Sequence, residues 1–281
     1  MRLTGLVLLL AACRSGDVDP SVPLPEGTVH LLVSGHAYEV LLVDAQGETL
    51  HQWSVDPAAH GVITDRGSFR RAWLQPDGGL LALIEYGSLW RLSIDSEVLW
   101  VVDDGNHHDI AVGPDALYSL TDADTLSTYS LAGQHQSDLP LIDIVQASEF
   151  SALQDAMATD GDPLHLNSLF LRDRTLLISS RATSHLMVLD LDQQALTFAS
   201  GGEFFGQHDA QFLPDGHVLL LDNGTRTTGS RPLELTFPAL PPVWSGDATG
   251  AFTSCCGTVQ RLSDGHTLWT ATTAGAAFEH D

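Results

Sequence analysis

The sequence predicts an all-β protein of the six-bladed β-propeller class, and three observations support this prediction. Past residue 27, short apolar runs alternate with Gly, Asp and Pro, without a long helical pattern. A hairpin unit, in which a turn containing Asp joins two apolar runs, recurs five times, with the turn aspartates at positions 77, 115, 173, 215 and 264. These aspartates lie 38, 58, 42 and 49 residues apart, a spacing that accommodates four strands per blade.

Each hairpin supplies the inner strands of a blade, and outer strands follow it. A third strand comes after each hairpin, and often a fourth that ends in Trp or another large apolar residue. The expected hairpins cover residues 71–84, 110–120, 169–178, 212–221 and 259–269. The longest interval contains residues 142–162, where we expect a short helical insertion. A parallel β-helix is the alternative architecture, but its repeats would be shorter.

The two ends of the repeat region are less regular. Three strands expected at 29–33, 40–43 and 49–55 supply a sixth blade, whereas the chain stops at Asp281, where a further strand is expected. We therefore expect a propeller domain over residues 28–281, with a last blade that is incomplete or closed by the N-terminal strands.

The N-terminus has the pattern of a bacterial lipoprotein signal. Arg2 precedes an apolar run that is too short to span a bilayer, and small residues stand directly before Cys13. We expect a signal peptide over residues 1–12, a lipid on Cys13 and a flexible tether over residues 13–27. Because Arg14 gives no clear reason for retention at the inner membrane, a periplasmic location on the outer membrane is favoured. The alternative is a cytosolic protein with an apolar start.

The charge balance excludes one class of partner. All twelve basic residues are Arg and the formal net charge is −24, so the surface repels nucleic acid. Membrane contact is expected only through the lipid on Cys13. The remaining cysteines, Cys255 and Cys256, are neighbours whose side chains would point to opposite faces of a strand, so we expect neither a structural disulfide nor a Cys-based metal site.

Polar triplets open three of the predicted inner strands. They are His107-His108-Asp109, His165-Leu166-Asn167 and Gln207-His208-Asp209. In a propeller the inner strands line the central channel, so these triplets should meet at one mouth. Arg181 ends the strand that returns beside the second triplet and should therefore lie near His165. Its guanidinium, with several imidazoles, would suit a sulfate or phosphate group.

Simpler interpretations of the same residues remain open. Asp109 and Asp209 could form hydrogen bonds that stabilise the blades, and the other nine histidines fit ordinary surface or core positions. A histidine cluster could bind a metal, although Arg181 would repel a cation, and we expect no metal or other cofactor. The sequence contains no nucleophile elbow of a serine hydrolase.

The ordered motifs resemble those of the bacterial arylsulfotransferases. His-His-Asp-Ile, His-Leu-Asn-Ser with Ile-Ser-Ser-Arg, Gln-His-Asp-Ala with Leu-Leu-Asp-Asn-Gly, and Val-Gln-Arg-Leu follow one another at blade spacing over roughly residues 65–280. Each motif alone is weakly specific, whereas four in order are more so. The resemblance implies a six-bladed, periplasmic or secreted enzyme that moves sulfate from an aryl sulfate ester to a phenol without a nucleotide donor.

The resemblance also implies residue roles. His208 matches the histidine that becomes sulfated, and His165, Asn167 and Arg181 match residues around the sulfuryl oxygens. His108, or its neighbour His107, matches the histidine that assists proton transfer. Thr253 or Ser254 could supply a further sulfate contact. These roles agree with the needs of the reaction: a nucleophile, donors to the developing charge and an acid for the phenolate.

Two classes of function follow from the sequence. The first is an aryl sulfotransferase that uses an aryl sulfate donor and a phenolic acceptor, with a ping-pong mechanism through a sulfohistidine. The alternative is a non-catalytic propeller lipoprotein that acts as a scaffold or binds an anion. A sulfatase is a third option, in which water replaces the phenol.

Overall fold

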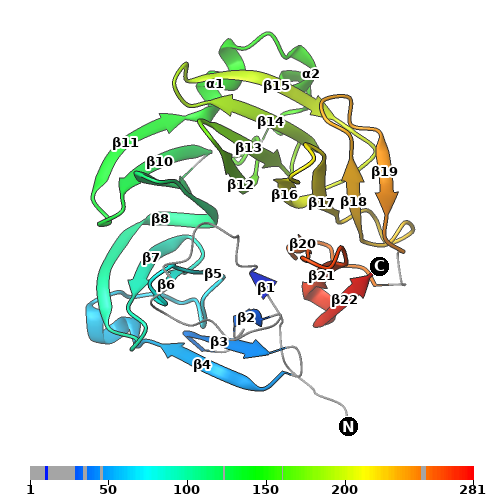
Figure 1. The fold of residues 1–281 in the computed structure, drawn as a ribbon. Coiled ribbons are helices and arrows are strands. Elements are labelled where there is room, and N and C mark those ends of the chain that lie inside the picture. The colour runs from blue at the N-terminus through cyan, green and yellow to red at the C-terminus, as the bar shows by residue number, and fades with distance from the viewer. Residues whose placement is uncertain are drawn as a thin grey trace. The chain divides into compact units, whose positions relative to one another are not determined.

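The computed structural model describes residues 10–11, 29–33, 37–44, 47–122, 124–159, 161–247 and 251–281. Cys13, the predicted tether and most of the predicted signal peptide lie outside these residues. The chain divides into two compact units, residues 1–108 with 132–134, and residues 109–131 with 135–281. Antiparallel β-sheet dominates both units (Figure 1). None of the helices that are described has the length and apolar character needed to cross a bilayer.

The first unit contains two groups of antiparallel strands. One group is β1 (Leu10–Ala11), β2 (Val29–Val33), β3 (Glu39–Asp44) and β4 (Thr49–Ser54); the other is β5 (Arg71–Leu74), β6 (Leu80–Leu83), β7 (Gly87–Leu92) and β8 (Val98–Val112), with the 3-10 helix η1 (Pro57–His60) between the groups. Trp53 and Trp90 are fully buried in the core that these strands share. Burying such large apolar side chains is the main stabilising contribution that a sheet of this size can make.

The second unit begins with the last residues of β8 and contains five further groups of elements. Three strands come first, β9 (Ala116–Thr121), β10 (Thr125–Ser130) and β11 (His135–Pro140), followed by the helices α1 (Leu141–Ala147) and α2 (Ser151–Ala156). Two four-stranded sheets come next: β12 (Leu166–Arg172), β13 (Thr175–Ser180), β14 (His185–Asp190) and β15 (Ala195–Gly201), and then β16 (His208–Phe212), β17 (Val218–Asp222), β18 (Arg231–Leu235) and β19 (Pro242–Ser245). The last sheet has three strands, β20 (Val259–Arg261), β21 (Thr267–Ala271) and β22 (Ala276–His280), with the 3-10 helix η2 (Thr272–Ala274) before β22.

Consecutive sheets of the second unit pack through shared apolar clusters. Leu176 and Ile178 of β13 pack in one cluster with Leu120, whereas Leu177 of the same strand packs in the next cluster with Leu220. Side chains that alternate along one strand thus serve the two faces of its sheet. This arrangement places the starts of the inner strands β12, β16 and β20 in neighbouring sheets.

The expected turns form as the sequence predicts. In the turns at Asp77, Asp215 and Asp264, Oδ1 accepts the backbone N–H two residues later at 3.0 Å. The glycine that follows each aspartate has a φ between 78° and 95°, a region that a side chain disfavours. All five expected hairpins are present, and the predicted insertion contains α1 and α2.

One expected boundary is wrong. The sequence predicts that His107-His108-Asp109 opens a new strand, but β8 continues without a break from Val98 to Val112. The chain bends inside the strand instead, at Gly105 and His108, which have φ values of 69° and 56°. Two residues in the left-handed region redirect a strand without ending it, which a pattern of apolar residues does not reveal.

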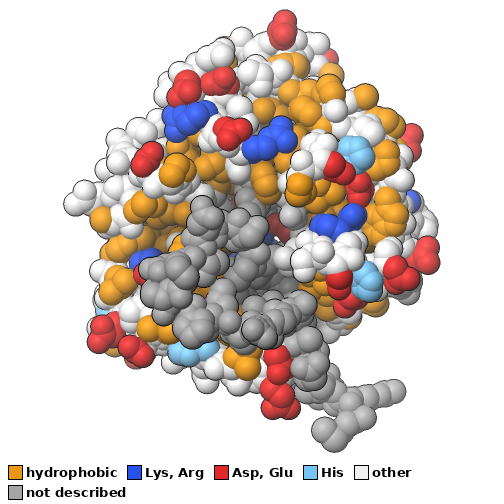
Figure 2. Space-filling view, in the orientation of Figure 1, with side chains coloured by type: hydrophobic (Ala, Val, Ile, Leu, Met, Phe, Trp, Pro, Cys, Tyr) orange, Lys and Arg blue, Asp and Glu red, His pale blue; other side chains and the backbone are white. Residues whose placement is uncertain are grey.

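The surface agrees with the acidic composition. Figure 2 shows Asp and Glu side chains scattered over the visible face, with single Arg side chains between them. No broad basic patch is visible there among the described residues.

Candidate functional site

His208 lies at the start of β16 and is bonded at both ring nitrogens. Its Nδ1 lies 2.7 Å from Asn223 Oδ1 and 3.0 Å from the carbonyl oxygen of Gly206, which are both acceptors. Its Nε2 accepts the backbone N–H of Cys256 at 3.1 Å. These partners assign the proton to Nδ1 and the lone pair to Nε2. The buried imidazole is therefore neutral, with its nucleophilic nitrogen directed at the Cys256 peptide.

Asn223 holds this arrangement from the end of β17. Its amide nitrogen donates to the carbonyl oxygens of Thr253 and Cys256, each at 3.0 Å, which fixes its oxygen toward His208. The side chain is almost completely buried. Asn223 thus joins His208 to the segment 253–256 through three hydrogen bonds.

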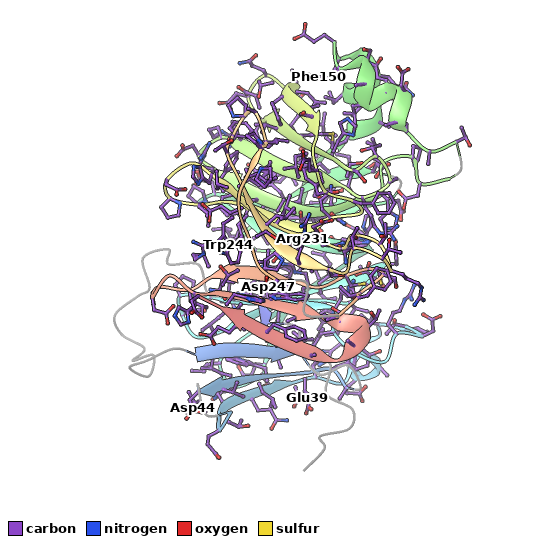
Figure 3. The ribbon with its side chains drawn as sticks, turned by 90° about the vertical axis from the view of Figure 1, so that its right-hand side faces the viewer. Glu39, Asp44, Phe150, Arg231, Trp244 and Asp247 are labelled. Atoms are coloured by element: carbon purple, nitrogen blue, oxygen red, sulfur yellow. The ribbon has the colours of Figure 1, made fainter. Side chains whose placement is uncertain are left out.

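Asp222, the residue before Asn223, forms hydrogen bonds to the backbone around the site. Its Oδ1 accepts the backbone N–H groups of Phe205 and Gly224 at 2.9 and 3.0 Å. Burial is the main influence on this carboxyl and raises its pKa, whereas its hydrogen bonds and the charge of Arg231, 3.4 Å away, act to lower it. Arg231 lies on β18 (Figure 3). Asp222 therefore fixes the backbone on both sides of the contact between His208 and Asn223.

The segment that donates to His208 has an unusual backbone. Cys256 and Gly257 have φ values of 67° and 99°. A Cβ at position 257 would lie 2.5 Å from both Leu221 Cδ2 and the carbonyl oxygen of Thr270, so only glycine fits there. Thr253 Oγ1 donates to the Cys255 carbonyl oxygen at 2.6 Å and closes the turn.

Arg181 lies where the hairpin geometry predicts. Its backbone N–H donates to the carbonyl oxygen of His165 at 3.0 Å, and its Nη2 donates to the carbonyl oxygen of Ser254 at 3.3 Å. Its buried Nε has no hydrogen-bond partner, and no described carboxylate forms an ion pair with it. A guanidinium with unused donors beside the His208 turn is a favourable position for an anion.

His165 is held by an acidic neighbour. Its Nδ1 lies 2.6 Å from Asp162 Oδ2, and its backbone N–H donates to the other oxygen of that carboxylate at 3.1 Å. The residue has a φ of 46°, so it adopts the left-handed region just before β12 begins. Asp162 thus fixes both the backbone and the ring of His165.

Asn167 has a structural role in addition to the one the resemblance implies. Its amide nitrogen donates to the carbonyl oxygen of Gln207 at 2.7 Å, and its Oδ1 has no hydrogen-bond partner. Gln207 in turn donates to Ser179 Oγ at 2.9 Å. Asn167 therefore positions the residue directly before His208 with one of its two amide N–H groups.

The aspartates of the His-Asp pairs join neighbouring sheets. Asp109 Oδ2 accepts the backbone N–H of Leu169 at 2.9 Å, and Asp209 Oδ2 accepts that of Val259 at 2.8 Å. Ser168 accepts the N–H of Ala210 at 3.1 Å in the same way. Both aspartates thus form hydrogen bonds between sheets, and the partner in each case is the backbone of the next inner strand.

The first unit holds the other two predicted site histidines. Nδ1 of His107 and Nδ1 of His108 lie 2.7 Å apart, so one ring donates and the other accepts. Glu85 Oε1 lies 3.3 Å from His108 Nδ1, and its other oxygen lies 3.3 Å from Arg70 Nε. The ring of Tyr86 stacks on His107, with centroids 5.1 Å apart. These contacts hold both rings against Glu85 and Tyr86 in the buried part of β8.

Two acidic groups with a histidine could in principle hold a metal. They are Asp215, His217 and Glu234, and Asp264, His266 and Glu279. Glu234, however, already pairs with Arg261 Nη2 at 2.6 Å. The glutamate hydrogen bond is the main cause of the raised pKa of both histidines, so each group acts as an ion pair on a hairpin.

Several residues of the site were not predicted from the sequence. Asn223 belongs to the Leu-Leu-Asp-Asn-Gly motif, but the motif alone did not predict its hydrogen bond to His208. Glu85 gave no signal, because its partner histidines are more than twenty residues away. The contact from Cys256 to His208 is made by the backbone N–H, so it does not depend on which side chain stands at position 256.

Comparisons with known proteins define the class of fold. No protein-family model and no curated protein match the sequence. Solved structures match at low identity, and these matches show that the chain has a β-propeller fold. A protein of unknown function from Bacteroides caccae is 13% identical over 90% of each chain, with a TM-score of 0.62.

Two further solved structures with a propeller fold match the chain. Virginiamycin B lyase from Staphylococcus aureus is 8% identical, covers 97% of this chain and 87% of its own, and has a TM-score of 0.59. The WD40 propeller domain of Doa1 is 10% identical, covers 87% of this chain and 72% of its own, and has a TM-score of 0.56. At these identities the likeness concerns the fold alone.

Proposed function

We propose that the protein is an aryl sulfotransferase that carries a sulfuryl group on His208 between an aryl sulfate ester and a phenol. The observation that carries this proposal is the hydrogen bond from His208 Nδ1 to Asn223 Oδ1 at 2.7 Å. It keeps the proton on Nδ1 and leaves the lone pair on Nε2, the state that a histidine nucleophile needs.

The first half-reaction forms a bond between Nε2 and sulfur and breaks the bond between sulfur and the aryl oxygen. The phenolate leaves with the electron pair and takes up a proton, a role that the resemblance gives to His108 or His107. The unused donors of Arg181 stabilise charge on the sulfuryl oxygens. In the second half-reaction the acceptor phenol returns its proton to the same histidine and its oxygen attacks sulfur, the bond to Nε2 breaks, and His208 is regenerated.

This proposal requires one movement. In the structure the N–H of Cys256 occupies the lone pair of Nε2. The turn at residues 253–257 must therefore release Nε2 before the attack. His165 bonds to Arg181, which reaches the turn at Ser254, and Asn167 bonds to Gln207, the neighbour of His208. These residues complete the proposed site.

The decisive experiment is mass spectrometry after brief mixing with 4-nitrophenyl sulfate and no acceptor. We expect release of nitrophenol and a sulfuryl adduct that maps to His208. His208→Ala should form no adduct, and His266→Gln, which changes a histidine on an exposed hairpin, should behave as wild type. Equal adduct formation by His208→Ala would exclude this nucleophile.

A non-catalytic anion-binding protein is the second candidate, and the bond between the Cys256 N–H and Nε2 favours it. A histidine whose lone pair is already used has a structural role, as Asp109 and Asp209 do. Titration calorimetry separates the candidates: binding of the aryl sulfate that depends on Arg181, without nitrophenol or adduct, supports the second one.

The remaining expectations belong to the same proposal. Six blades fit the five hairpins and the N-terminal strands β2 to β4. Attachment of a lipid to Cys13 would place the protein in the periplasm, where aryl sulfates are accessible without transport.

A further inference from the structure

The adjacent cysteines of the His208 turn lie in unusually close contact. Cys255 and Cys256 are both partly exposed, and their Sγ atoms are 2.8 Å apart. Two sulfurs that only touch lie farther apart, whereas a disulfide is about 2.05 Å long. Less than about 1 Å of movement therefore separates this contact from a covalent bond.

We infer that Cys255 and Cys256 form a reversible vicinal disulfide that controls access to His208. The disulfide itself is independent of the proposed function, whereas its effect on catalysis rests on that function. The oxidised form holds the turn on His208, and the dithiol form releases it.

The chemistry requires an oxidant of the disulfide class, such as oxidised glutathione. A thiolate of one cysteine attacks a glutathione sulfur, forms a mixed disulfide and releases one glutathione thiolate. The second cysteine then loses its proton and attacks the protein sulfur of the mixed disulfide. The new bond forms as the second glutathione leaves, so two protein thiols are oxidised and one glutathione disulfide is reduced.

Geometry makes this disulfide easy to reduce. The Cα atoms of consecutive residues lie about 3.8 Å apart, which is shorter than the usual 4.4–6.8 Å of bridged cysteines. The resulting strain raises the reduction potential, and strained, exposed disulfides are the labile and regulatory ones. The φ of 67° at Cys256 shows that the turn already adopts an uncommon backbone conformation in the dithiol state.

The peptide group inside the new ring couples the disulfide to His208. A vicinal disulfide closes a ring around the bond between Cys255 and Cys256, and the N–H of that bond donates to His208 Nε2. The carbonyl group of Cys256 is held by Asn223 at 3.0 Å. Because the sulfurs are close while this N–H is in place, ring closure preserves the contact and restricts rotation that would break it.

The first test measures the bond itself. The full chain with Cys13→Ser is treated with oxidised glutathione and analysed by intact and peptide mass spectrometry. We expect a loss of two hydrogens that maps to one peptide with both cysteines, and a thiol count that falls from two to zero. Cys255→Ser and Cys256→Ser, the matched controls, should form only mixed disulfides. Wild-type chains that carry only glutathione or dimerise would overturn the proposal.

The second test measures the coupling. The rate of nitrophenol release should fall about tenfold on oxidation, because the hydrogen bond from the Cys256 N–H to Nε2 must break before attack and one ordinary hydrogen bond corresponds to about this factor. Reduction with dithiothreitol should restore the rate. The double variant Cys255→Ser, Cys256→Ser, which has no thiol at the turn, should keep the same rate with and without oxidant. Equal rates in both redox states of an active protein would overturn the control of His208.

A third readout separates this proposal from the proposed function. If neither redox form releases nitrophenol, the sulfotransferase proposal fails, and hydrogen exchange of the Cys256 amide decides the coupling. Slower exchange in the disulfide form supports it, and equal exchange in the two forms overturns it.

Discussion

Asp209 on β16 accepts the backbone N–H of Val259 on β20 at 2.8 Å, so a side chain at the start of one inner strand bonds the inner strand of the next sheet. We expect Asp209→Ala to lower the free energy of unfolding by about 1–3 kcal/mol, because it leaves the Val259 N–H without its acceptor. Asp209→Asn keeps an acceptor oxygen and should cost less. Denaturant unfolding of the three proteins provides the measurement, and equal losses for both variants would contradict the hydrogen-bond explanation.

Asn223 is expected to act as a positioning residue for His208. Asn223→Ala removes the shorter of the two acceptor contacts of Nδ1 and two hydrogen bonds to the turn, so adduct formation should slow by about 100-fold, as expected when a reacting group is misplaced. Stopped-flow measurement of nitrophenol release would give this rate, with a small change in KM. A purely structural role would instead lower stability and leave the rate of the folded fraction unchanged.

Gly257 and Gly216 form a matched pair of turn glycines, with φ values of 99° and 91°. Nothing lies within 4 Å of a Cβ at Gly216, so Gly216→Ala should cost only the conformational penalty of about 1–2 kcal/mol. Gly257→Ala also meets a backbone oxygen at 2.5 Å and should cost clearly more. Thermal unfolding of both variants tests this difference, and equal shifts in Tm would show that the turn at 257 can relax.

His217 and His266 should make stability depend on pH. The hydrogen bonds of Glu234 and Glu279 are the main cause of their raised pKa values in the folded state. Their contribution is therefore fully present below the ordinary histidine pKa of about 6.5 and is lost as the pH rises through the folded values. The unfolding free energy of wild type should fall over this range more than that of a His217→Gln, His266→Gln protein. Parallel pH profiles would show that these pairs contribute nothing.

Part of the fold could be predicted because local chemistry specifies it. Asp-Gly turns such as Asp215-Gly216 need a side-chain acceptor and a positive φ, so they mark hairpins in the sequence itself. The uninterrupted path of β8 could not be predicted, since Asp104-Gly105 has the pattern of a hairpin turn but bends the strand without ending it. Hydrophobic periodicity reports burial and not the direction that the chain takes.

The candidate site divides in the same way. The closeness of Arg181 to His165 follows from antiparallel pairing and was predicted. The contact from the Cys256 N–H to His208 was not, because any residue except Pro has this donor. Only the folded path of the turn shows which peptide faces the imidazole.

The bonds from Asp109, Ser168 and Asp209 to the following inner strand also bear on how such a chain can change over time. Each successive junction needs one acceptor near the beginning of an inner strand and a main-chain donor, which every residue except Pro provides. Among the described residues, the three hydrogen bonds involve only the inner strands β8, β12, β16 and β20. A junction of this kind places few demands on the rest of a blade, so in this chain most blade positions can be substituted without loss of the connection between the sheets.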